Sequence, residues 1–102
     1  MTTIGTLTDF VDGAARRVDV DGTAVCVVRI GESFYAIGDT CSHADFSLSE
    51  GDVWADDCEI ECPKHGAMFS LVDGTPTTLP ATSPVPVFDV TIDGDDVKVT
   101  AR

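Results

Sequence analysis

The chain has 102 residues, of which 18 are acidic and six are basic, and its formal net charge is −12. This length supports one hydrophobic core, so a second domain with its own substrate cleft is not expected. The negative charge disfavours binding to nucleic acid or to an anionic membrane and favours a basic protein surface as partner. An alternative explanation of the acidity is that it only keeps a small protein soluble.

The N-terminus shows no recognisable targeting signal. Residues 1–5 include no basic residue and no apolar stretch, and no window of the chain approaches the roughly 18 apolar residues of a membrane span. We therefore expect a soluble protein of the cytoplasm. We also expect it to be a monomer.

Short apolar and alternating runs predict β-strands in the first forty residues. Residues 7–13 are predicted as a loop, because Thr, Asp and Gly supply its turn residues. From Ala15 apolar and charged residues alternate, and the pair Asp21-Gly22 separates this run from the apolar residues 25–30, which is a strong hairpin signal. After a turn at residues 31–33, the run 34–37 predicts a further strand.

The second half continues with short strands and turns. Residues 52–54 and 58–62 are predicted as strands, and residues 68–72 lead to a turn at Asp73-Gly74. The stretch 80–86 contains three prolines and is predicted as a stiff loop outside any ladder. Residues 87–92 and 97–100 predict a closing hairpin. Because no window shows the helical period, we predict an all-β fold, a small antiparallel β-sandwich or barrel, as a single domain over residues 1–102.

Two short motifs combine cysteine with histidine. They are a Cys-x-His motif at residues 41–43 and a Cys-x-x-His motif at residues 62–65, and they contain the only two histidines of the chain. In an extended backbone the first pair leaves the chain on one side, whereas the second pair needs a turn, for which Pro63 and Gly66 are suitable. Two thiolates and two imidazoles predict a metal site that suits zinc or an iron–sulfur cluster.

Together with their flanking residues, the two motifs resemble the cluster-binding loops of Rieske [2Fe–2S] proteins. The resemblance extends to residues 34–37, 47–51 and 79–87, and so covers nearly the whole chain. It implies a Rieske-like fold, with a cluster-binding part formed by two loops at approximately residues 40–70, and one [2Fe–2S] cluster as cofactor. In that arrangement Cys41 and Cys62 hold the inner iron, and His43 and His65 hold the outer iron near the surface.

The two cysteines outside these motifs are expected to be structural. Cys26 lies in an apolar run, and Cys58 is expected to share the inward face of a strand with Ile60, with a redox-sensitive thiol as the alternative. For Trp54 we expect a place in the core, with a contribution to docking as the alternative.

Four positions depart from the high-potential Rieske domains of respiratory and photosynthetic complexes. Phe46 and Lys64 stand where those domains carry disulfide-forming cysteines, and Ala67 and Phe69 stand where they carry hydroxyl donors. Hydroxyl donors stabilise the reduced cluster, so their absence is expected to lower the potential toward about −150 mV, the low end of the Rieske range. Lys64 opposes this shift only slightly, because solvent screens its charge. We also expect a potential that is nearly independent of pH around neutrality.

The resemblance implies electron transfer rather than catalysis. A Rieske-type ferredoxin carries single electrons, in the usual setting from an NAD(P)H-dependent ferredoxin reductase to the terminal oxygenase of an aromatic-ring-hydroxylating system. The exposed edges of the two histidines would be the electron exit, framed by Asp45, Phe46, Lys64 and the loop 80–86. No catalytic residue is predicted, since no nucleophile stands near a free base.

Two alternative functions remain open at the level of the sequence. The same cluster could serve iron–sulfur assembly or a nitrite-reductase-type system, and neighbouring genes would distinguish these from an oxygenase role. From a different class, a zinc-stabilised structural module would act only through protein contacts, and it would be colourless.

Overall fold

The computed structural model describes residues 2–40, 47–63, 66–77 and 83–101. Within these ranges the chain forms two antiparallel sheets and three short 3-10 helices, none of them long and apolar enough to cross a membrane. The large sheet has the strand order β1-β9-β8-β4-β3-β2, and the small sheet has the order β5-β6-β7. The bounds are β1 Thr2–Thr6, β2 Ala15–Val20, β3 Thr23–Ile30, β4 Ser33–Gly38, β5 Val53–Trp54, β6 Glu59–Glu61, β7 Met68–Ser70, β8 Val87–Asp93 and β9 Asp96–Ala101, with helices η1 Leu7–Asp9, η2 Leu48–Glu50 and η3 Ala55–Asp57. The predicted all-β fold is confirmed.

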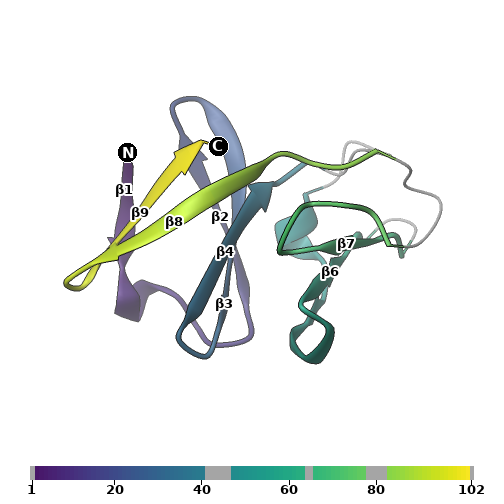
Figure 1. Cartoon of the computed structure of the whole chain (residues 1–102), viewed down its shortest axis with the longest axis horizontal. Helices are drawn as coiled ribbons and strands as arrows, with labels where there is room; N and C mark the ends of the chain where they lie inside the picture. The colour runs from purple at the N-terminus through teal and green to yellow at the C-terminus, as the bar shows by residue number, and fades with distance from the viewer. Residues whose placement is uncertain (1, 41–46, 64–65, 78–82, 102) are drawn as a thin grey trace.

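The large sheet curls into a nearly closed barrel, and the small sheet stands at one end of it (Figure 1). The first and last strands of the chain, β1 and β9, lie side by side in the barrel, away from β6 and β7. The small sheet therefore forms a separate layer, and the described residues of the predicted cluster-binding part belong to it or border it.

The hairpin predicted around Asp21-Gly22 is confirmed, since β2 pairs with β3 along its whole length. Asp21 and Gly22 have φ angles of 51° and 84°. Two consecutive positive φ angles are typical of a type I′ turn, whose twist matches that of the paired strands. The closing hairpin of β8 and β9 is confirmed as well.

Strand β1 was not predicted from the sequence. It pairs with β9 at the other end of the chain, with a shift of register between Thr3 and Gly5. The segment that follows β1, predicted as a loop, begins with η1 and is held by Arg29, whose Nη1 donates to the carbonyl oxygens of Leu7 (3.0 Å) and Phe10 (3.1 Å). These bonds stabilise the seam of the barrel next to β1.

Strand β3 is buried on both faces, which explains why its apolar residues run on without alternation. Val25 and Val27 pack with Val97 and Val99 inside the barrel. The opposite face of β3 contributes to a second cluster, hereafter the inter-sheet core, which joins the barrel to the small sheet. Its buried members are Cys26, Val28, Ile37, Leu48, Ile60, Cys62, Ala67, Phe69, Leu71 and Val85.

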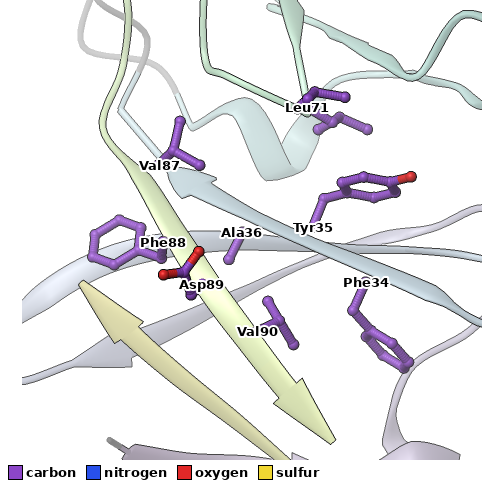
Figure 2. A pocket seen from close by; sticks show the side chains of 9 residues that line it. Phe34, Tyr35, Ala36, Leu71, Val87, Phe88, Asp89 and Val90 are labelled. Atoms are coloured by element: carbon purple, nitrogen blue, oxygen red, sulfur yellow. The ribbon is translucent and has the colours of Figure 1, made fainter. Parts of the chain in front are cut away.

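Strands β4 and β8 pair over a short distance only. Their ladder places Ala36 opposite Phe88 and Ile37 opposite Val87, and beyond it the strands separate (Figure 2). The separation leaves a surface hollow of about 240 Å³. It is lined by Phe34, Tyr35, Ala36, Leu71, Val72, Val87, Phe88, Asp89 and Val90. Leu71, a member of the inter-sheet core, places the hollow at the junction of the barrel with the small sheet.

Candidate metal centre

Of the four predicted ligands, Cys62 lies within the described residues. The other three, Cys41, His43 and His65, lie outside them, as do the neighbouring Asp45, Phe46 and Lys64. The described residues include both ends of the segment that carries the first motif. They also include both ends of the turn that carries the second motif.

The two ends of the first ligand segment are joined through Asp39, directly after β4. The backbone N–H of Leu48 donates to the carbonyl oxygen of Asp39 (2.6 Å), and the N–H of Ser49 donates to its carboxylate Oδ1 (2.9 Å). Thr40 and Ser47 form an isolated antiparallel bridge next to these bonds. Residues 40 and 47 therefore stand side by side, at the base of the segment 41–46.

The second motif is carried by a turn that follows β6. The N–H of Cys62 donates to the carbonyl oxygen of Ala67 (2.7 Å), and the N–H of Gly66 donates to the carbonyl oxygen of Cys62 (3.1 Å). Gly66 has a φ angle of 74°, which glycine adopts without strain. The turn predicted from Pro63 and Gly66 is confirmed, and it leaves Cys62 only 1% exposed.

The segments that carry the two ligand motifs are hereafter called the first arm and the second arm. The chain that follows the first arm meets the second arm at Gly51. A Cβ atom on Gly51 would overlap the carbonyl oxygen of Glu61, and it would lie 3.2 Å from Cδ of Pro63. The N–H of Glu61 donates to the carbonyl oxygen of Asp52 (2.8 Å). The chain that leaves the first arm thus lies directly against the backbone that enters the second.

The described end of the proline-containing loop, residues 83–86, joins both parts. The N–H of Gly38 donates to the carbonyl oxygen of Pro86 (2.8 Å), and the N–H of Val85 donates to the carbonyl oxygen of Gly74 (3.0 Å). A Cβ on Gly74 would overlap the carbonyl oxygen of Val85. As predicted, residues 83–86 belong to no strand. They brace the end of β4 against the turn after β7.

The chemistry of Cys62 fits an iron–sulfur ligand. Its thiol forms no disulfide and lies in the inter-sheet core, at the start of a hydrogen-bonded turn. A soft sulfur donor held rigidly and away from solvent is what such a cluster requires. Elsewhere in the described ranges, no group of three His, Cys, Asp or Glu side chains is arranged to hold a metal ion.

The other two cysteines have different surroundings. Burial, and after it the charge of Asp39, raises the pKa of the fully buried Cys26 thiol far above its ordinary value, so Cys26 is inert at neutral pH. The prediction that Cys58 lies on a strand with Ile60 was wrong, but its partly buried side chain packs against the inter-sheet core, to which Ile60 belongs. Cys58 has a φ angle of 54° and ends η3, because the connection between β5 and β6 is short and needs a left-handed residue to leave the helix. Its neighbour Tyr35 has a raised pKa, chiefly through a hydrogen bond with Cys58.

Trp54 is 49% exposed, so the prediction of a core position was wrong. It lies on a two-residue strand, where alternation turns Val53 toward the inter-sheet core and Trp54 away from it. Its indole Nε1 donates to Oε1 of Glu61 (3.1 Å), the residue before Cys62. The hydrogen bond places an exposed aromatic ring beside the second arm.

Comparison with known proteins shows the family to which this chain belongs. Residues 1–89 match the Rieske [2Fe-2S] domain family. The chain is 40% identical over 89 residues to the 3-phenylpropionate/cinnamic acid dioxygenase ferredoxin subunit of Escherichia coli K12, which covers 87% of this chain and 82% of the relative.

Two solved structures extend the likeness to the fold. The ferredoxin of carbazole 1,9a-dioxygenase from Nocardioides aromaticivorans IC177 has a TM-score of 0.95 and 41% identity, over 100% of both chains. A chain in the complex of reduced oxygenase and oxidized ferredoxin in carbazole 1,9a-dioxygenase has a TM-score of 0.88 and 39% identity, over 96% of this chain and 90% of that one. The chain therefore belongs to the Rieske [2Fe–2S] domain family, whose cofactor is a [2Fe–2S] cluster.

Proposed function

We propose that this protein is a Rieske-type ferredoxin that delivers single electrons to the terminal oxygenase of a ring-hydroxylating dioxygenase system. The main support is its full-length similarity to the ferredoxin of carbazole 1,9a-dioxygenase. A second similar chain comes from a complex of oxygenase with ferredoxin, which supports an oxygenase as partner. An NAD(P)H-dependent reductase as electron donor is part of the same proposal. A cytoplasmic location and a monomeric state belong to the proposal as well.

We assign the cluster to four ligands, with Cys41 and Cys62 on the inner iron and His43 and His65 on the outer iron. When bound, the cluster supplies a one-electron redox couple. The turn at residues 62–67 fixes the position of Cys62, and the inter-sheet core keeps water away from its sulfur. Because all four protein ligands are committed to iron, the assignment leaves no open position for a substrate. The role is therefore transfer rather than catalysis.

We predict a reduction potential near about −150 mV, at the low end of the Rieske range. Ala67 and Phe69 are fully buried in the inter-sheet core and have no hydroxyl to donate to a reduced cluster. A potentiometric titration of the purified holoprotein, followed by visible absorption and electron paramagnetic resonance, measures the potential and identifies the ligand type. The potential should change little with pH around neutrality. A colourless protein that contains zinc would contradict the proposed function, and a potential near about +300 mV would contradict the role of the missing hydroxyls.

The described cluster-binding part has a uniformly acidic surface. All charged side chains in residues 47–63 and 66–77 are carboxylates: Glu50, Asp52, Asp56, Asp57, Glu59, Glu61 and Asp73. Such a surface attracts a basic partner and speeds the encounter, while exposed charge pairs add little lasting affinity. Brief docking suits a carrier that has to leave one partner before it meets the next.

Trp54 is expected to contribute to docking on the oxygenase. Its ring is half exposed beside the acidic residues, and aromatic residues are typical of interface positions that contribute most to affinity. We predict that Trp54→Ala slows the second-order reduction of the terminal oxygenase about tenfold, which corresponds to about 1.4 kcal/mol. Stopped-flow kinetics with the dithionite-reduced ferredoxin measures this rate.

The matched control for Trp54 is Ile92→Ala. Ile92 is 42% exposed and lies on β8, in the barrel rather than in the small sheet. Its replacement should leave the rate unchanged, and neither variant should change the reduction potential. Equal rates for the Trp54→Ala variant and the unmodified protein would show that the partner docks elsewhere.

A further inference from the structure

Asp39 is the one charged side chain that is buried among the described residues, with 1% of its surface exposed. It stands between β4 and the first ligand motif, two residues before Cys41. A buried carboxylate is costly unless its oxygens have partners, so its presence at this place needs an explanation.

The carboxylate of Asp39 has two partners, a backbone N–H and a charged guanidinium group. Oδ1 accepts the N–H of Ser49 at 2.9 Å, which ties the far end of the first ligand segment to its start. Oδ2 lies 3.8 Å from Nε of Arg17, whose side chain is 57% exposed. That separation exceeds a good hydrogen bond, and water screens the exposed guanidinium. Arg17 therefore offsets the charge of Asp39 only in part.

The charge of Asp39 also interacts with a group in the inter-sheet core, the thiol of Cys26. Arg17 lies opposite Cys26 on the neighbouring strand, and the carboxylate contributes to the raised pKa of the Cys26 thiol. Cys26 shares the inter-sheet core with Cys62. A charge in this poorly polarisable region interacts more strongly with other charges than a charge at the surface does.

We propose that Asp39 is a positioning residue for the first ligand arm and that its buried negative charge lowers the reduction potential of the cluster. The inference rests on the proposed ligand set, in which Cys41 follows Asp39 by two residues. Reduction adds one electron, and therefore one negative charge, to a centre whose assigned ligand Cys41 follows this carboxylate by two residues. The charge disfavours the reduced state, in the same direction as the missing hydroxyl donors at residues 67 and 69.

The test separates the two roles with two variants of the holoprotein. Asp39→Asn keeps an oxygen acceptor for the Ser49 N–H and removes the charge. It should raise the equilibrium constant for reduction between about threefold and tenfold, where tenfold equals about 59 mV for one electron. Its iron content and paramagnetic resonance signal should be unchanged. Asp39→Ala removes the acceptor as well and should lose iron to a chelator about tenfold faster.

Two further variants change the charge of exposed side chains on β2 and leave Asp39 in place. Asp19→Asn removes an exposed carboxylate from β2 and should leave the potential unchanged. Arg17→Gln removes the partly compensating cation from the surface and should shift the potential in the direction opposite to Asp39→Asn. Both positions are exposed, so these proteins should fold normally.

The outcomes separate this inference from the proposed function. A protein without any [2Fe–2S] signal would overturn the proposed function itself. An intact cluster whose potential is the same in Asp39→Asn and the unmodified protein, or one that shifts equally in Asp19→Asn, would overturn the role of Asp39.

Discussion

Replacing Cys62 by alanine is expected to abolish the bound cluster, whereas replacing Cys26 by alanine is expected to leave it in place. The two thiols are matched controls for each other, because they are 1% and 0% exposed and both belong to the inter-sheet core. Each substitution deletes one buried sulfur atom, with a packing cost of about 1 kcal/mol. They differ in what the sulfur is assigned to do, since Cys62 begins a hydrogen-bonded turn and Cys26 lies in the middle of β3.

The measurement is the iron and sulfide content per chain, together with visible absorption, after identical purification of both variants. Cys26→Ala should be brown, with full iron content and a slightly lower unfolding midpoint. Cys62→Ala should be colourless or nearly so, because three ligands cannot retain both irons in the family arrangement. A brown Cys62→Ala protein with full iron content would refute the ligand assignment. Loss of colour in Cys26→Ala would mean that packing of the inter-sheet core, rather than ligation, decides retention.

The parts of the fold that local chemistry determines were predicted from the sequence. The hairpin at Asp21-Gly22 is an example, because both turn residues tolerate the positive φ angles that the turn requires. Strand β1 is the opposite case. Its five residues include three threonines, and it pairs with β9, so the signal that makes it a strand lies at the far end of the chain.

The donor residues of the candidate site were predicted from the spacing of the two motifs, but their supports were not. Asp39 could have been suspected only as a charged residue directly after the apolar end of β4, which is a weak signal without its contact to Ser49. Trp54 was expected in the core, because a strand of only two residues is too short for its alternation to be recognised in the sequence. Contacts between distant segments decide both cases.

Gly51→Ala is expected to lower the stability of the holoprotein by about 3 kcal/mol, the upper end of the usual cost of overpacking. Gly51 has a φ angle of −87°, an ordinary value for alanine, so backbone strain is not the reason. The added Cβ would overlap the carbonyl oxygen of Glu61, a backbone atom that no rotamer change can move. Relief requires a shift either of η2, which carries the buried Leu48, or of the end of β6, which leads into Cys62.

The informative control for Gly51 is Gly94→Ala, in the turn between β8 and β9. Gly94 has a φ angle of 64°, which costs alanine about 1 kcal/mol, but its Cβ would meet nothing within 4 Å. Backbone strain alone would make Gly94→Ala the more harmful change, whereas the contact between the two arms predicts the reverse order. Thermal unfolding of both holoproteins, followed at the visible cluster absorption, decides between them. Because either shift around residue 51 moves one ligand arm against the other, Gly51→Ala should also release iron at a lower temperature than Gly94→Ala. Equal midpoints would mean that the arms can separate without cost to the site.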